Sequence, residues 1–421
     1  MKSTNYLSLA SATLALAMGL TACGTDSGSN ASDNKTLVIS GNASEKSGLD
    51  AVIDEFKKAN PGVEVNVNYD KDPAAIVRTQ LAAGTAADVL YVFSGQSALS
   101  TGALAPDGYL TDLSNEAWAG KQPESSNMIN DVDGKRYMAA ILVNGIGAIY
   151  NDTTMMATKL VAPTTFPEVL QFCDDAKAQG KFAYAMGMAD KFVGQMVPYA
   201  LASTLVYGPT PDIDEKLKSG ASKFAETAWV DAIEKTKEMQ DRGCFSPSPV
   251  GTSYDSSLQQ VAKGEALGVV MVNSAINGIQ KSAPDAKLTF KALPATDTAS
   301  ATQMPVAYGG TYAINSKAKN PEMAKKFLDH LTTNTSADLY AEKVGSVPFH
   351  MDGSQVTATA GADITSITQF QNEDKTSVFP NVLWPNPKVQ SNFLSGIQEV
   401  FGGAKTAAEL AESLQAAYDT K

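Results

Sequence analysis

The chain has 421 residues, and its 45 acidic side chains outnumber its 33 basic ones, which gives a formal net charge of -12 at pH 7. This acidic balance, without any stripe of basic residues, argues against a nucleic-acid-binding protein. His330 and His350 are the only histidines, and the three cysteines form no paired motif, so we expect no metal site and no cofactor.

The first 22 residues have the parts of an export signal. Lys2 supplies a positive charge, residues 7–20 form an apolar run too short to span a bilayer comfortably, and Leu20-Thr21-Ala22-Cys23 is a small-residue cleavage site. These four residues resemble the lipobox of bacterial lipoproteins, which implies cleavage before Cys23 and a diacylglycerol anchor on its thiol. An ordinary cleaved signal with a cysteine nearby by chance is the alternative. Residues 23–34 are rich in Gly, Ser, Asn and Asp, so we expect a flexible linker.

The part of the chain that follows this linker is long and only moderately apolar. About 390 residues are too many for a single ordinary core, so we expect two domains. No later stretch is apolar for long enough to cross a membrane, and we expect a soluble body on the extracellular face of the cell membrane, held there by lipid alone. Cys173 and Cys244 could form a disulfide in that compartment, or they could remain buried free thiols.

Strands and helices alternate along most of the chain. In order, we expect strands at 35–40, 63–67, 88–93, 135–150 and 267–272, and helices at 49–58, 74–83, 165–180, 226–242, 256–263, 321–332 and 393–418, the last with a break at Gly402-Gly403. The alternation of the first five elements is typical of an α/β fold with a parallel sheet. Ligands of such sheets lie beyond the carboxyl ends of the strands, which here means residues 40–45 and 93–96.

Five blocks of sequence are individually weak signals, but their order and spacing along the chain are together a strong indication of a protein family. The blocks are LDAVIDEFKKANPGVEVNV at 49–67, LAAGTAADVLYV at 81–92, DGKRYMAAILVNGIGAIYND at 133–152, VAKGEALGVVMVN at 261–273 and GGTYAINSKAKNPEMAKKFLDHLTTNTSADLYAEKVGSVP at 309–348. Together they resemble the bacterial extracellular solute-binding proteins of family 1, the group of the maltose-binding protein. The resemblance covers nearly the whole chain after the signal.

The resemblance implies a two-lobe α/β fold of the periplasmic-binding-protein type II, with discontinuous lobes and a hinge. Lobe one would comprise residues 35–143 with 308–349, and lobe two residues 145–303 with 354–421. The chain would cross between the lobes near Asn144, near 304–307 and near 345–353. The family also implies that the protein delivers its solute to the permease subunits of an ATP-driven importer, and we expect the binding protein itself to be a monomer.

The ligand site should combine polar side chains from both lobes with aromatic rings, because sugar hydroxyls need paired polar partners and sugar C–H faces need flat apolar surfaces. Carried over position by position, the resemblance implies ligand contacts from Asn42, Ser44, Glu45, Phe93, Ser94, Gln96, Asn144, Asn273, Ser274, Tyr308, Gly309 and Gly310. Tyr254 and Trp384 are the aromatic candidates, because both lie in polar connecting segments, although aromatic residues in loops more often serve local packing. The maltose-type pattern has a carboxylate at the position of Asn144, which argues against maltose itself.

Other functions remain open at this point. A lipid-anchored hydrolase would need catalytic signatures, but Ser94 lies in no Gly-x-Ser-x-Gly motif and no phosphate-binding loop is present, so we expect no enzyme. A surface adhesion module would show a large apolar patch. Among binding proteins, the alternative solutes to a sugar are an anion, a polyamine and iron. An anion site would draw on arginine, of which the chain has only Arg78, Arg136 and Arg242.

Overall fold

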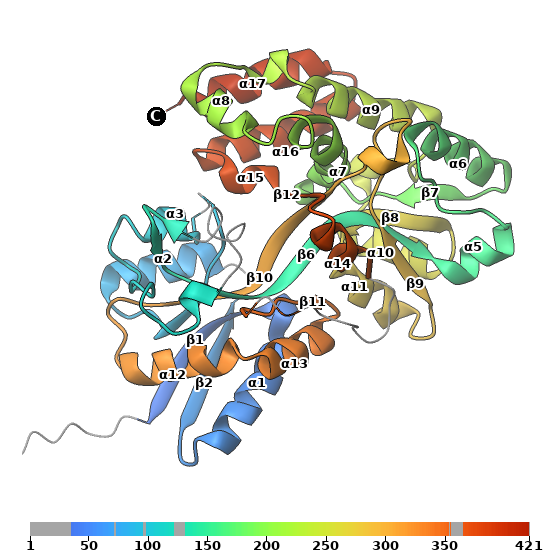
Figure 1. The fold of residues 1–421 in the computed structure, drawn as a ribbon. Coiled ribbons are helices and arrows are strands. Elements are labelled where there is room, and N and C mark those ends of the chain that lie inside the picture. The colour runs from blue at the N-terminus through green and yellow to red at the C-terminus, as the bar shows by residue number, and fades with distance from the viewer. Residues whose placement is uncertain are drawn as a thin grey trace, which may run out of the picture. The chain divides into compact units, whose positions relative to one another are not determined.

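The computed structural model describes residues 35–70, 73–95, 98–121, 131–352, 354 and 365–420 (Figure 1). All of these belong to one compact unit that begins at Lys35. The expected export signal, the anchor residue Cys23, the linker at 23–34 and the candidate ligand residue Gln96 lie outside the described residues.

The fold begins with three parallel strands, as the alternation of strand and helix predicts. β1 (Thr36–Asn42) lies between β2 (Glu64–Asp70) and β3 (Val89–Tyr91) and pairs with both in parallel. α1 (Lys46–Ala59) connects β1 to β2, and α2 (Pro73–Ala83) connects β2 to β3. The apolar positions that predict α1 are its buried face, since Leu49, Val52 and Phe56 are completely buried.

Two long strands extend this sheet and change partners along their length. β6 (Ala139–Asn151) pairs antiparallel with β10 (Met304–Ile314) up to Gly145, and from Ile146 onward it pairs with β8 (Ala266–Val272). β10 also pairs with β3 and with β12 (Thr376–Val378), while β9 (Leu288–Lys291) and β11 (Val347–Pro348) pair with β6. The order along the sheet is β2-β1-β3-β10-β6-β8-β7, with β7 (Phe182–Ala185) parallel to β8. The change of partners in β6 is adjacent to Asn144, where the sequence predicts the first crossing.

Helices pack around both parts of this sheet (Figure 1). The longer ones are α6 (Phe166–Ala178), α9 (Trp229–Arg242), α12 (Pro321–Leu331), α13 (Asn334–Val344), α16 (Pro387–Phe401) and α17 (Ala407–Tyr418). Shorter elements are η1 (Ala43–Glu45), α3 (Thr101–Leu104), β4 (Asp131–Val132), β5 (Lys135–Arg136), α5 (Asp152–Thr158), η3 (Lys191–Gln195), α7 (Met196–Ala202), α8 (Ile213–Ser219), α10 (Tyr254–Ala262), α11 (Ala275–Ser282), α14 (Thr365–Asn372) and α15 (Pro380–Leu383). The C-terminal pair breaks at Gly402-Gly403 as predicted, but α16 begins at Pro387 rather than at residue 393, because Asn386 caps it and Pro387 suits its first turn.

A disulfide joins α6 to the segment after α9. It links Cys173 to Cys244, whose Cα atoms are 4.7 Å apart. The two cysteines therefore pair, which decides between the two alternatives that the sequence leaves open.

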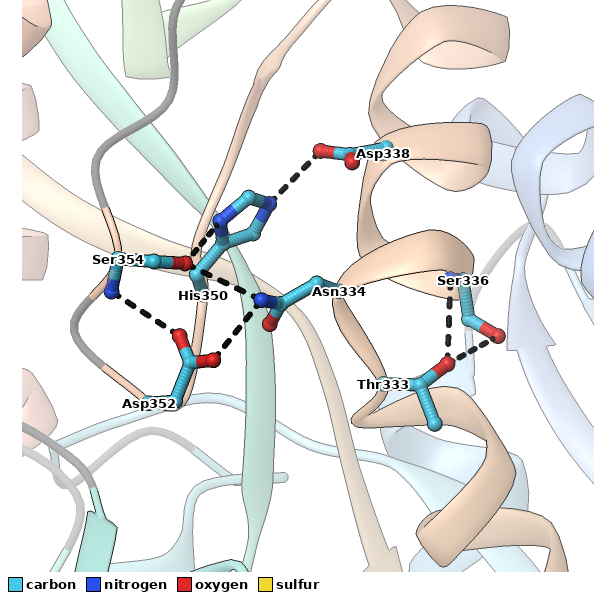
Figure 2. Close-up of polar contacts among 7 residues, drawn as sticks. All are labelled: Thr333, Asn334, Ser336, Asp338, His350, Asp352 and Ser354. Carbon is cyan, nitrogen blue, oxygen red and sulfur yellow. Dashed lines mark hydrogen bonds and ion pairs between the residues drawn. The ribbon is translucent and has the colours of Figure 1, made fainter.

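The segment after β11 is fastened to α13 by side-chain hydrogen bonds, which Figure 2 shows. His350 lies at the centre, with Nε2 2.8 Å from Asp338 Oδ1 and Nδ1 2.8 Å from Ser354 Oγ. Asn334 donates from Nδ2 to Asp352 Oδ2 at 3.0 Å and to Ser354 Oγ at 3.1 Å. This is the third place at which the sequence predicts a crossing, and His350 has a structural role there.

None of the described helices is both long enough and apolar enough to cross a bilayer. In the same part of the chain, no three side chains of His, Cys, Asp or Glu gather in a way that could hold a metal ion.

Candidate functional site

A pocket of about 400 Å³ lies where the loop after β3 and the middle of β6 and β10 meet the segment that leads into α16. Its described lining residues are Tyr91, Phe93, Ser94, Asn144, Val272, Ala307, Tyr308, Gly309, Phe379, Asn381, Val382, Asn386, Pro387 and Gln390. None of these described residues is an acid or a base of the Asp, Glu, His, Lys or Arg type. The polar groups in this lining are amides and hydroxyls, and the lining also contains aromatic rings. This combination suits a neutral polar molecule.

The last residue of β3, Tyr91, and two predicted ligand residues of the loop after it, Phe93 and Ser94, line the pocket. The ring of Phe93 is 43% exposed and packs edge-on against Tyr91, with the ring centroids 5.2 Å apart. Ser94 Oγ is enclosed, and no other described group bonds to it. Gly95 follows with φ +87°, and a Cβ there would lie 2.8 Å from the carbonyl oxygen of Val382. Glycine is therefore required both by the backbone conformation and by the close approach of the opposite wall.

Glu45 is held away from the pocket by tyrosines. Its carboxylate accepts hydrogen bonds from Tyr91 Oη at 2.9 Å and from Tyr340 Oη at 2.8 Å, and a further hydrogen bond of 2.9 Å connects Tyr340 and Tyr312. Burial raises the pKa of Glu45, and the two phenols and the Gly310 N–H partly offset that rise. Glu45 therefore fixes Tyr91, a wall of the pocket, and does not itself line the pocket.

Asn42, the last residue of β1, and Ser44 of η1 are joined by hydrogen bonds. Asn42 Oδ1 accepts from Ser44 N at 3.0 Å and from Ser44 Oγ at 2.8 Å, so Asn42 caps the short helix η1. Neither residue is part of the pocket lining. The loop after β1 therefore does not contribute these two predicted side chains to the described lining of the pocket.

β6 and β10, in the middle of the sheet, contribute three of the predicted ligand residues to the lining. Asn144 of β6 and Tyr308-Gly309 of β10 line the pocket together. The ring of Tyr308 packs against Phe349, with centroids 4.7 Å apart, and Gly309 lies beside the Asn144 amide, where a Cβ would be 2.4 Å from Nδ2. Gly310, with φ +56°, does not line the pocket. Its backbone N–H bonds to the Glu45 carboxylate.

The segment from Phe379 to Gln390 forms the opposite wall, and sequence reasoning missed most of it. Six of its residues line the pocket, which are Phe379, Asn381, Val382, Asn386, Pro387 and Gln390. Gln390 donates from Nε2 to the buried Gln195 Oε1 at 3.0 Å, so the amide that it presents is held in place. The signal available in the sequence is the set of amide side chains on both sides of Trp384, namely Asn381, Asn386 and Gln390.

Trp384 is a core residue, contrary to the prediction of an aromatic platform. It is 1% exposed. Its ring centroid lies 5.9 to 6.1 Å from the ring centroids of four other aromatic residues, which are Tyr199, Phe224, Trp229 and Phe393. The Pro-rich segment around it turns the indole inward, because so large an apolar surface is more stable in the core than in solvent.

Three other predicted residues lie outside the pocket lining. Asn273 is completely buried, and its amide oxygen accepts a hydrogen bond of 2.8 Å from Gly145 N. Ser274 is exposed at the start of α11. Tyr254, at the start of α10, packs against Phe192 with centroids 5.3 Å apart, and burial raises the pKa of its phenol to about 12.

Comparison with known proteins identifies the kind of molecule to which this pocket belongs. A family described as bacterial extracellular solute-binding protein matches residues 41–338. A multiple sugar-binding protein from Streptococcus mutans is 21% identical over 373 residues, and the maltodextrin-binding protein MdxE from Bacillus subtilis is 23% identical over 397 residues; each match covers 87% of this chain and 86% of the relative. The solved structure of SBP RafE in complex with raffinose has a TM-score of 0.76 at 19% identity, covering 91% of this chain and 98% of that chain. The likeness confirms the two-lobe α/β fold, and the family match places this chain among the bacterial extracellular solute-binding proteins, which bind solutes and are not enzymes.

Proposed function

We propose that the protein binds a neutral carbohydrate in the pocket described above. The observation that carries the proposal is the lining itself, in which Asn144, Asn381 and Gln390 supply amides and Tyr91 and Phe93 supply rings. Amides can pair with sugar hydroxyls as donors and acceptors, and rings can stack on sugar C–H faces. The named relatives from Streptococcus mutans and Bacillus subtilis are sugar-binding and maltodextrin-binding proteins, which supports the same class of ligand.

The lining gives less support to the other solutes. An anion or a polyamine would leave a charge unpaired in the pocket, since none of the described lining residues carries a compensating charge, and burying such a charge is costly. Iron would require deprotonated tyrosines. Tyr91 donates its hydroxyl proton to Glu45, and burial together with that carboxylate raises the pKa of Tyr91 well above its usual value, so a phenolate is disfavoured there.

We place the pocket at the junction of the two lobes, with lobe one at 35–143 and 308–349 and lobe two at 145–303 and 354–421. On this division Tyr91, Phe93 and Tyr308 belong to lobe one, and the wall from Phe379 to Gln390 belongs to lobe two. A ligand that contacts both walls stabilises the closed arrangement by its differential affinity.

The test is a thermal-shift screen of the purified protein, without its first 22 residues, against raffinose, maltotriose, xylotriose and chitotriose. At least one of these saccharides should raise the melting temperature in proportion to the logarithm of its concentration, because it binds only the folded state. The saccharide should be recovered chemically unchanged. A panel of anions, polyamines and ferric citrate that stabilises the protein while every saccharide is inert would contradict the proposal.

The protein is further proposed to be a lipid-anchored monomer that hands its solute to the permease subunits of an importer. The resemblance of Leu20-Thr21-Ala22-Cys23 to a lipobox supports the anchor. Cys23→Ala removes the acceptor thiol, so we expect the variant to appear in the culture medium while the unaltered protein remains with the membrane fraction. Cys23→Ala protein that stays in the membrane fraction would rule out the lipid as the anchor.

A further inference from the structure

A chain of buried polar side chains lies next to the pocket, where β6 changes partners. The Gly145 N–H donates to Asn273 Oδ1 at 2.8 Å. Asn273 Nδ2 donates to Ser346 Oγ at 3.5 Å, and Ser346 Oγ donates to Asn144 Oδ1 at 2.7 Å. Asn273 is 0% exposed and Ser346 is 1% exposed, whereas Asn144 is partly buried and lines the pocket.

The direction of this chain is set by its first member. A backbone N–H can only donate, so the oxygen of the Asn273 amide must face Gly145 and its nitrogen must face Ser346. Ser346 Oγ accepts from that nitrogen and has a single proton to give. Two acceptors lie within its reach, Asn144 Oδ1 at 2.7 Å and the Val143 carbonyl oxygen at 3.4 Å, and the much shorter hydrogen bond is the one to Asn144. This bond uses one of the two lone pairs of the Asn144 oxygen, and it leaves both N–H groups of the amide to donate to a ligand.

The backbone of Gly309 packs against the Asn144 amide. Gly309 lies so close to the amide nitrogen that any side chain at position 309 would displace it. Asn273 and Ser346 come from different parts of the chain, since Asn273 follows β8 and Ser346 lies between α13 and β11. Their side chains connect the backbone at Gly145 to the pocket residue Asn144 through hydrogen bonds.

We infer that Ser346 and Asn273 are positioning residues that fix Asn144 as a hydrogen-bond donor to an acceptor oxygen of the solute. The inference deepens the proposed function and rests on it for the identity of the solute, which we take to be a neutral saccharide. Neither positioning residue lines the pocket, so each acts only through Asn144.

The first test needs no ligand. In protein labelled with ¹⁵N-asparagine, the side-chain NH₂ signals of Asn144 and Asn273 are assigned by their loss in Asn144→Ala and Asn273→Asp. We expect the Asn144 NH₂ protons to exchange rapidly with water in the free protein. Those of Asn273 should be protected, because they are buried and bonded to Ser346.

The variant Asn273→Asp should reverse the direction of the hydrogen bond between Ser346 and Asn144. Aspartate still accepts from Gly145 but cannot donate to Ser346, so Ser346 should donate to Asp at 273 and accept from Asn144 instead. The Asn144 NH₂ protons should then become protected in the free protein. Protected Asn144 protons in the unaltered protein, or no change in Asn273→Asp, would overturn the inference.

The second test measures affinity by calorimetry for whichever of raffinose, maltotriose, xylotriose or chitotriose gives the largest thermal shift. Asn144→Ala should weaken binding about 10-fold, the usual loss for one hydrogen bond to a ligand. Ser346→Ala should weaken binding by a similar factor, and the double variant should be no weaker than Asn144→Ala alone, because both changes remove the same interaction. Ser346→Thr, which keeps the hydroxyl, should restore most of the affinity.

A matched control separates positioning from general loss of packing. Ser366 is another buried serine, and its Oγ donates to the Phe290 carbonyl oxygen at 2.7 Å, away from the pocket lining. Ser366→Ala should leave affinity unchanged even if it lowers stability. Losses that add in the double variant, or an equal loss in Ser366→Ala, would overturn the positioning role. If none of the four saccharides binds, the proposed function fails, and the exchange experiment still judges the polarity of Asn144.

Discussion

Asp214 is a carboxyl group held in a mostly apolar environment at the start of α8. Burial raises its pKa from 3.8 to about 7, and the neighbouring Tyr207 hydroxyl offsets only part of that rise. The folded protein therefore holds this proton over a pH range in which the unfolded chain has already released it. As pH rises from about 4 to about 7, the unfolded state gains an ionisation that the folded state resists, so stability falls.

Asp214→Asn should remove this loss of stability. The variant should equal the unaltered protein near pH 4 and exceed it at pH 8 by a few kcal/mol, on the order of 1.4 kcal/mol for each unit of pKa shift. Urea unfolding at pH 4.5, 6 and 8 measures the difference. Asp212→Asn is the control, because Asp212 is exposed, pairs with Lys216 and has a lowered pKa. A stability difference for Asp214→Asn that does not grow with pH would contradict the account.

Two aromatic residues should respond in opposite ways to truncation. Trp384→Ala leaves a cavity among four packed rings and should cost about 3–5 kcal/mol of stability. Phe93→Ala removes an exposed ring at the pocket and should change stability by less than about 1 kcal/mol while weakening saccharide binding. Denaturant unfolding and calorimetry distinguish the two effects. A stable Trp384→Ala variant that has lost its ligand would restore the platform role that the sequence predicts.

For single residues, the sequence predicts where a side chain lies in the fold better than it predicts which group that side chain binds. Asn144 and Asn273 are both asparagines that follow or interrupt apolar strands, yet only Asn144 lines the pocket. The side-chain oxygen of Asn273 accepts a hydrogen bond from the backbone N–H of Gly145, which is 128 residues away in sequence. Pairing at such separations is decided by the tertiary fold, so a pattern of residue types cannot reveal which amide is still available to a ligand.

Elements are more predictable, because their signals are local. Thr165 with Glu168 forms a capping box at the start of α6, and the apolar face of α1 matches its spacing. The wall from Phe379 to Gln390 was missed because its short helix α15 has no periodic pattern, and its place beside the pocket comes from β12, which pairs with the first residues of β10.

The disulfide between Cys173 and Cys244 should stabilise α6 and α9 against each other. It closes a separation of 71 residues, so its removal by a Cys173→Ala and Cys244→Ala double variant should cost about 2–4 kcal/mol. Saccharide affinity should be unaffected below the melting temperature, because neither cysteine lines the pocket. Unfolding of the oxidised protein, the reduced protein and the double variant measures the cost. Equal stability of oxidised and double-variant protein would show that the link contributes nothing.

At the scale of the whole molecule, the arrangement of β6 and β10 is the feature that would allow the two walls of the pocket to move against each other. Each strand pairs with one set of partners at one end and with another set at the other end, and the pocket residues Asn144 and Tyr308 lie between. On the proposed division into lobes, Gly95 belongs to lobe one and Val382 to lobe two, and their backbones lie close together, so a rotation of one lobe against the other would separate them. Binding at the junction would therefore change the separation of the two walls.

Small-angle X-ray scattering of the free protein and of the protein saturated with the best-binding saccharide tests this account most directly. We expect a decrease in the radius of gyration that follows the binding isotherm with one saccharide per chain, and the saccharide should be recovered intact. A radius of gyration that stays constant through saturation, or a saccharide that is converted to another product, would contradict a solute-binding protein that closes around its ligand.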